Sequence, residues 1–168
     1  MMRIFKEKQR FNKLWLIILI LSSLVMAMAM IIAAYLKNPD SFTTLELMGI
    51  ISLSVGASGL IFLFKLTTRI DEKGISYKFF PFHFSYKVIN WFDVEKAYVR
   101  HYDAISEYGG WGIKGGPLWS KSKGKAINVS GDIGIQLELK NGKKLLIGTQ
   151  KKAEAENVLA TYSIKINT

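Results

Sequence analysis

The feature that most constrains this chain is an uncharged apolar run of 23 residues, Leu14 to Leu36. As an α-helix, this run is roughly 34 Å long, which is enough to cross a hydrocarbon core about 30 Å thick. A second uncharged run, Leu47 to Phe64, has 18 residues, and its apolar character continues to Leu66. The sequence therefore predicts a membrane anchor over residues 1–66, with transmembrane helices at 14–36 and 47–66 and a short loop at 37–46.

Basic residues flank the two runs unevenly. Five Lys or Arg residues precede the first run and several follow the second, whereas the loop has only Lys37 against Asp40 and Glu46. Because basic residues next to a span resist translocation, both termini are expected in the cytoplasm, in a multi-pass protein of the inner (cytoplasmic) cell membrane. A signal peptide cleaved near Ala27 to Ala29 is the alternative. The apolar run continues far past the usual signal core of about 7–15 residues, so an uncleaved anchor fits better.

Small residues recur along both runs at helical spacing. Lipid provides no hydrophobic drive for helix association, so small side chains that allow close approach favour packing. The predicted packing seam, either within the hairpin or with a second copy, consists of Ser23, Ala27, Ala34, Gly49, Ser52, Gly56 and Gly59. Neither run contains an ionisable Asp, Glu, Lys, Arg or His residue, so ion or proton transport is not expected.

The remaining residues, 67–168, are predicted to form one domain that is mostly β-strand. A hairpin is expected around Asp71 to Gly74, because the glycine is able to take a positive φ angle. Apolar and polar residues alternate from Ile133 to Lys140, which indicates a half-buried strand. Asn141-Gly142 follows this strand. A three-residue loop there pairs Leu137 with Leu145, whereas a two-residue loop places Leu145 opposite Glu138, so we expect the former.

The end of the chain changes to a helical period. Thr149 is a suitable N-cap, and residues 150–162 place apolar side chains on one face of a helix. Six or seven strands followed by one amphipathic helix are typical of a small, partly open barrel or a strongly bent sandwich. The helix is expected to close one end of it.

Several ordered motifs in this half resemble the bacterial pleckstrin-homology-like domain family, including members with two N-terminal membrane spans. The motifs are Tyr108-Gly109-Gly110-Trp111-Gly112-Ile113, Gly124-Lys125-Ala126-Ile127-Asn128-Val129-Ser130-Gly131, Gly134-Ile135-Gln136-Leu137-Glu138-Leu139 and Leu146-Ile147-Gly148-Thr149-Gln150. The resemblance implies an α+β, mainly β fold of two near-orthogonal antiparallel sheets capped by a C-terminal helix, used for binding or assembly. Eukaryotic pleckstrin-homology domains that bind phosphoinositides place Lys and Arg around the first hairpin turn. Here that turn is Asp71-Glu72-Lys73-Gly74, which argues against such a ligand.

The segment from Asp103 to Lys125 is long for a loop in a compact domain and is rich in glycine, tryptophan and lysine. Exposed tryptophans would anchor a protein partner, and the lysines would meet anionic headgroups or an acidic partner. The candidate partner or lipid surface consists of Tyr108, Gly109, Gly110, Trp111, Gly112, Lys114, Trp119, Lys121 and Lys123. The alternative is a fixed turn with Trp111 packed into the core.

Other chemistry has little support in the sequence. Cysteine is absent, so disulfides, thiolate metal sites and cysteine nucleophiles are excluded. His83 and His101 are the two histidines and lack a metal-ligand spacing. His101, Asp103 and Ser106 are the residue types of a catalytic triad, but no nucleophile elbow is present. The net charge of +10 is spread along the chain, so membrane orientation explains it better than nucleic-acid binding.

These observations predict a non-enzymatic membrane protein without a metal or cofactor. It would display its pleckstrin-homology-like domain in the cytoplasm to bind a protein partner or to self-assemble. A structural subunit of a larger membrane complex, assembled through the transmembrane helices, is the alternative function.

Overall fold

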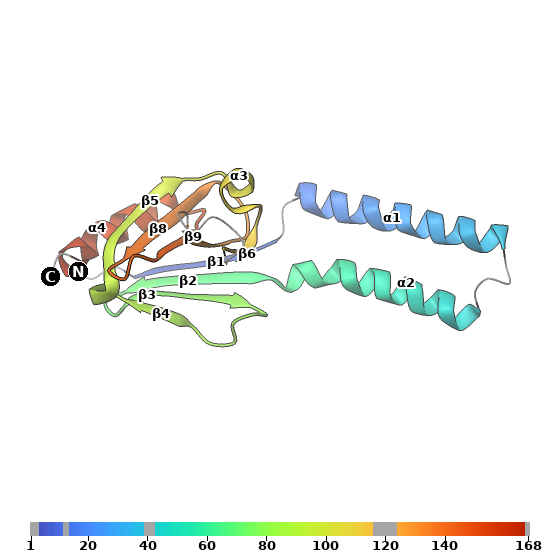
Figure 1. Cartoon of the computed structure of the whole chain (residues 1–168), viewed down its shortest axis with the longest axis horizontal. Helices are drawn as coiled ribbons and strands as arrows, with labels where there is room; N and C mark the ends of the chain where they lie inside the picture. The colour runs from blue at the N-terminus through green and yellow to red at the C-terminus, as the bar shows by residue number, and fades with distance from the viewer. Residues whose placement is uncertain (1–3, 12–13, 39–42, 116–123, 167–168) are drawn as a thin grey trace. The chain divides into compact units, whose positions relative to one another are not determined.

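The computed structural model describes residues 4–11, 14–38, 43–115 and 124–166. The chain forms two compact units (Figure 1). The helical unit covers Phe11–Leu63, and the globular unit combines Met1–Arg10 with Phe64–Thr168. The helical unit is therefore inserted into the sequence of the globular unit.

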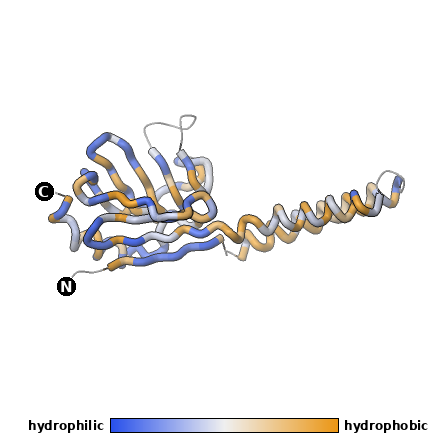
Figure 2. Tube along the Cα trace, turned by 90° about the horizontal axis from the view of Figure 1, so that it is seen from below, coloured by the Kyte–Doolittle hydropathy of each residue, from blue (hydrophilic) through white to orange (hydrophobic). Residues whose placement is uncertain are grey.

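The helical unit contains two apolar helices, as predicted. Helix α1 spans Leu14–Lys37, and helix α2 spans Thr44–Gly59 and continues as the 3-10 helix η2, Leu60–Leu63. A capping box starts α2, because the Thr43 hydroxyl accepts from the Glu46 N–H and the Glu46 carboxylate accepts from the Thr43 N–H. Figure 2 shows apolar residues along both helices. Both are long and apolar enough to cross a membrane, and neither contains a buried residue, unlike a core helix of a soluble protein.

Four serines of these helices, Ser22, Ser23, Ser54 and Ser58, donate their hydroxyl groups to backbone carbonyls of the preceding turn. The Ser23 hydroxyl donates to the Ile20 carbonyl at 2.8 Å, and the Ser54 hydroxyl donates to the Ile50 carbonyl at 2.8 Å. Such bonds remove the cost of placing a free hydroxyl group in an apolar environment. Serine is therefore compatible with either helix in a bilayer.

The covered face of α2 is not the predicted stripe of small residues. In α2 the half-buried residues are Leu47, Ile51, Ser54 and Ser58. Gly49, Ser52, Gly56 and Gly59 are exposed, and a Cβ atom built on any of these three glycines meets nothing within 4 Å. On α1, Ala27 is half-buried, whereas Ser23 and Ala34 are exposed. Leu47 and Ile51 share the covered face of α2 with Ser54 and Ser58, and the glycine stripe remains open.

The first sheet of the globular unit has four antiparallel strands in the order β1-β2-β3-β4. Their bounds are β1 Phe5–Arg10, β2 Lys65–Asp71, β3 Gly74–Phe80 and β4 Lys87–Asn90. Strands β1 and β2 pair continuously from Phe5↔Ile70 to Arg10↔Lys65, so the helical unit takes the position of a hairpin turn. The β2–β3 hairpin confirms the turn predicted at Asp71 to Gly74.

The boundary between the units differs from the predicted boundary at residue 66. Leu66 is fully buried in β2, and Phe5, Glu7 and Gln9 of β1 are at most 6% exposed. The Glu7 carboxylate accepts from the Thr149 hydroxyl at 2.6 Å and from the Gln150 N–H at 2.8 Å, and Gln9 donates to the Gly148 carbonyl. The basic N-terminal segment is therefore a strand of the globular unit, although two of its three inward residues are polar.

The second sheet has five strands in the order β5-β8-β9-β7-β6. Their bounds are β5 Val94–His101, β6 Gly112–Lys114, β7 Lys125–Asn128, β8 Ile133–Leu139 and β9 Lys144–Gly148. Leu137 pairs with Leu145, and Gly142 has a φ angle of 76°, which confirms the predicted three-residue loop. Strands β7 and β9 pair in parallel, so this sheet is not fully antiparallel as expected.

Three helical elements complete the globular unit: the short η3 Trp91–Asp93 and α3 Ala104–Tyr108, and the longer α4 Lys152–Ile166. Helix α4 contacts β5, η3, β1 and β8 and buries Ala155, Val158, Leu159 and Tyr162, which confirms the predicted amphipathic helix. Tyr162 stacks on Trp91, with ring centroids 5.2 Å apart. The described residues thus form an α+β fold of nine strands in two separate sheets, so the expected barrel is not closed.

Candidate functional site

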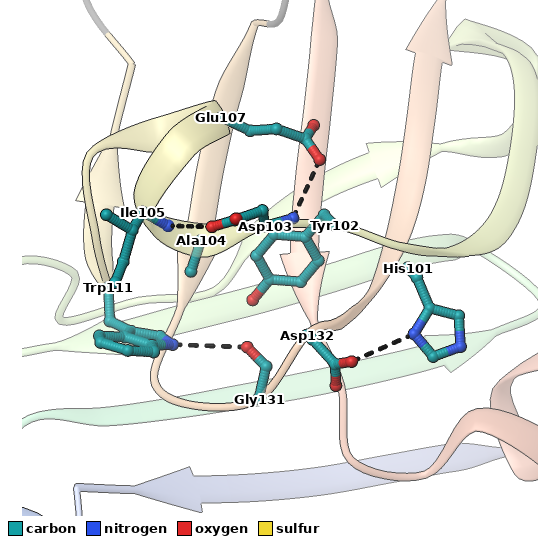
Figure 3. A pocket seen from close by; sticks show the side chains of 9 residues that line it. All are labelled: His101, Tyr102, Asp103, Ala104, Ile105, Glu107, Trp111, Gly131 and Asp132. Carbon is teal, nitrogen blue, oxygen red and sulfur yellow. Dashed lines mark hydrogen bonds and ion pairs between the residues drawn. The ribbon is translucent and has the colours of Figure 1, made fainter.

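An open depression lies beside α3 in the globular unit (Figure 3). Its volume is about 640 Å³. Its lining comes from the end of β5, from α3, from Trp111 and from the turn before β8. The lining residues are His101, Tyr102, Asp103, Ala104, Ile105, Glu107, Trp111, Gly131 and Asp132.

Helix α3 forms because Asp103 caps its start. The Asp103 carboxylate accepts from the N–H groups of Ile105 and Ser106 at 2.8 and 3.0 Å, and the Glu107 carboxylate accepts from the Asp103 N–H at 3.0 Å. The helix ends at Gly109, which has a left-handed φ angle of 72°. Asp103 is therefore a helix cap, whereas His101 pairs with Asp132, so the three triad-type residues do not form a triad.

Arg100 fixes α3 against the second sheet. Its guanidinium makes two bonds to the Glu107 carboxylate, at 3.1 and 2.8 Å, and further bonds to Gln136 on β8 and to the Tyr108 hydroxyl. The hydrogen bond with Glu107 is the main cause that raises the pKa of Arg100. Because these partners lie on different elements, one side chain holds the wall of the depression in place.

Buried polar groups support the floor of the depression. The Tyr102 hydroxyl accepts from the Asn128 side-chain amide at 3.0 Å, and the Asn128 carbonyl accepts from the Gly112 N–H at 2.9 Å. Burial is the main cause that raises the pKa of Tyr102 to about 12. Gly148 lies against this pair, where a Cβ atom would be 2.9 Å from the Asn128 Cβ. Tyr102 thus stays neutral at physiological pH and acts as a structural group.

The structure separates the predicted surface residues into different roles. Tyr108 is 3% exposed and belongs to a core cluster, and Trp111 packs partly buried against that cluster while its indole N–H donates to the Gly131 carbonyl at 3.4 Å. Gly109 and Gly110 follow α3, and Gly112 and Lys114 begin and end β6. Trp119, Lys121 and Lys123 lie outside the described residues. Trp111 is therefore partly packed against the core, and it also lines the depression.

Sequence reasoning missed two parts of this site. Ile105 is 67% exposed at the rim, and His101 and Asp132 form an exposed pair with Nδ1 and Oδ2 3.2 Å apart. No local motif marks either part, because Asp132 reaches His101 through the β5–β8 pairing of distant segments. An isolated apolar residue in a polar segment was the one available signal for Ile105.

The depression offers an apolar wall, with Ile105 and Trp111, and a polar wall, with His101 and Asp132. This combination suits a protruding side chain of another protein. Within the described part of the chain, no group of three or more His, Asp or Glu residues is placed to hold a metal ion.

Comparisons with known proteins identify no relative. Neither the family models nor the curated proteins nor the solved structures contain a match to this chain. The resemblance to bacterial pleckstrin-homology-like domains therefore stays a prediction, and the function has to be argued from the geometry.

Proposed function

We propose that this chain is a non-enzymatic integral membrane protein that presents its globular unit in the cytoplasm to bind a protein partner or to self-assemble. The observation that carries the proposal is the insertion of two apolar helices between the paired strands β1 and β2. The globular unit would be a variant of the pleckstrin-homology-like scaffold.

Strand pairing supports a location of both chain ends on one side of the membrane. If α1 and α2 both cross the bilayer, the segments before α1 and after η2 emerge on the same side, where β1 and β2 pair. Lys6, Lys8 and Arg10 precede α1, and Lys65 and Arg69 follow η2, so the distribution of basic residues favours the cytoplasmic side.

Cysteine labelling tests this topology directly, because the chain has no native cysteine. Asp40→Cys, in the segment between the helices, is expected to react with a membrane-impermeant maleimide in intact cells. Lys73→Cys, in the β2–β3 turn, is expected to react only after the membrane is permeabilised. Reaction of both or neither residue in intact cells would contradict the two-span topology.

The depression beside α3 is the proposed partner surface. Crosslinking followed by mass spectrometry on the full-length protein in its native membrane tests it. Ile105→Glu, at the exposed rim, is expected to remove crosslinks from this surface, whereas Ile164→Glu, at an even more exposed position on α4, is expected to retain them. Equal crosslinking in the two variants would overturn the proposed surface.

A structural role in a larger membrane complex is the second candidate. The exposed stripe of Gly49, Gly56 and Gly59 favours it, because a neighbouring helix is able to approach closely there. Gly56→Leu is expected to dissociate such a complex in mild detergent, and Val55→Leu serves as the control. An unchanged complex in both variants would exclude association through this stripe.

A further inference from the structure

The connection between β3 and β4 carries an unusual concentration of exposed aromatic residues. Phe82, Phe84 and Tyr86 are 63%, 79% and 48% exposed, and Val88 at the start of β4 is 53% exposed. Exposed apolar side chains grouped in this way mark a site of contact with a protein or a membrane.

This aromatic loop, residues 81–86, has a defined conformation. The His83 N–H donates to the Phe79 carbonyl at 2.8 Å, and the His83 ring accepts from the Phe79 N–H at 3.4 Å. Tyr77 packs edge-on against the His83 ring, and Phe80 packs edge-on against Phe84. These contacts fix His83 and the Phe84 ring, while Phe82, Phe84 and Tyr86 remain exposed.

The aromatic loop lies at the end of the sheet where the chain passes into the helical unit. Arg10 pairs with Lys65, and Lys65 pairs with Phe80, so these three residues form one row across the sheet. Phe64 directly follows η2, and its ring stacks on Phe82 and Phe79 with centroids 5.8 and 5.9 Å apart. The loop is thus in contact with the first residue after the apolar helices.

Cationic side chains gather at the same end of the sheet. Arg10 and Lys65 lie in the same row of the sheet as Phe80. Lys8 and Lys78 lie in the row of Thr67. The two rows are two residues apart, which is about 7 Å along a strand. The carboxylate on the outward face, Asp71, lies at the opposite end of β2 and pairs with Arg69 at 2.7 Å. This end of the outward face is therefore positive.

We propose that the aromatic loop and these four cations form a second membrane contact, in which Phe82, Phe84 and Tyr86 enter the interfacial region of an anionic bilayer. The inference rests on the proposed function, because the membrane is the one that contains the helical unit. Aromatic rings beside basic residues match the boundary between acyl chains and anionic headgroups. A bilayer is favoured over a protein partner because the loop adjoins the residue at which the chain leaves the apolar helices.

Site-specific quenching tests the contact on the full-length protein. Single cysteines at Ser85, Lys73 and Met30 are each labelled with a polarity-sensitive fluorophore, and the protein is reconstituted in vesicles of equal parts phosphatidylcholine and phosphatidylglycerol that contain a lipid-attached quencher. Ser85→Cys keeps every aromatic side chain of the loop. Lys73→Cys probes the opposite end of the same β2–β3 hairpin, and Met30→Cys probes α1.

Quenching at positions 85 and 30 with little quenching at 73 is the expected result. Quenching at 30 alone, or equal quenching at 85 and 73, would overturn the loop contact and leave the membrane hairpin intact. Absence of quenching at 30 would overturn both proposals.

Lys8→Gln in the protein labelled at position 85 is expected to lower the ratio of inserted to free loop about fivefold, with no change for Lys152→Gln on α4. Equal effects of these two substitutions would exclude the electrostatic part of the contact.

Discussion

Tyr102 links the stability of the globular unit to alkaline pH. Its pKa is raised to about 12, against about 10 in the unfolded chain. Between these pH values the folded state keeps a proton that the unfolded state has lost, so the free energy of unfolding falls as pH rises from 10 to 12. The expected loss from this residue is about 3 kcal/mol, since one pKa unit corresponds to about 1.4 kcal/mol.

Denaturant titrations of wild type and Tyr102→Phe between pH 8 and 12 measure this loss. The phenylalanine variant is expected to be less stable at pH 8, because the Asn128 amide loses its acceptor, and to show a shallower decline above pH 10. Parallel pH profiles would show that Tyr102 does not carry the effect.

Arg100 provides a second prediction at the residue scale. Glu107→Gln keeps the shape of the side chain but removes the charge from a pair whose side chains are 26% and 22% exposed. The expected decrease in the free energy of unfolding is about 2 kcal/mol, because hydrogen bonds to charged groups are among the stronger ones. Glu154→Gln breaks the exposed pair with Lys151 and is expected to change stability little. Similar losses in both variants would contradict a special role of Arg100.

The β2–β3 turn is sensitive to one added methyl group. Gly74 has a φ angle of 147°, and a Cβ atom there would collide with the Ile89 carbonyl oxygen on β4. Gly74→Ala is expected to cost more than about 2 kcal/mol and to loosen β4. Gly142→Ala, at a φ angle of 76° with open space around it, is expected to cost about 1 kcal/mol. Thermal unfolding with amide exchange of Ile89 measures both effects.

Elements with a strong local signal could be predicted from the sequence. The β8–β9 register follows from the alternation of Ile135 and Leu137 with polar residues and from Gly142, and α4 follows from its helical spacing of apolar residues. Strand β1 has no such signal, because Glu7 and Gln9 point inward and find partners at Thr149 and Gly148 that are distant in sequence. Polar burial of this kind becomes visible only when the tertiary partners are known.

The candidate site was predictable only in part for the same reason. The unusual segment after Asp103 drew attention to Trp111, which does line the depression. The opposite wall depends on strand pairing that places Asp132 beside His101, and the support depends on Arg100 reaching Gln136. Contacts between residues more than thirty positions apart have no signature in a single sequence.

At the scale of the whole molecule, the insertion predicts which fragments are able to fold. Replacing residues 12–63 by Asn-Gly joins β1 to β2 through a short hairpin and keeps Phe5 and Glu7 in the core. This variant is expected to be soluble and to unfold cooperatively. A fragment that begins at Phe64 lacks β1, uncovers the hydrogen-bonding edge of β2 and leaves Thr149 without Glu7, so it is expected to unfold without a cooperative transition.

Thermal melts followed by circular dichroism compare the two fragments. Equal cooperativity would show that β1 is dispensable and that the domain boundary lies near residue 66, as the sequence predicts.

The register of β1 with β2 also sets the order of events during synthesis. The ribosome releases β1 before either apolar helix, so β1 has to wait for β2 until both helices have been made. If these helices insert as a pair, the bilayer brings the two strand ends together and removes most of the loop-closure entropy. A chain that fails to insert would keep the edge of β2 uncovered, and such an edge invites aggregation or degradation. Completion of the first sheet would thereby depend on insertion of both helices in the membrane.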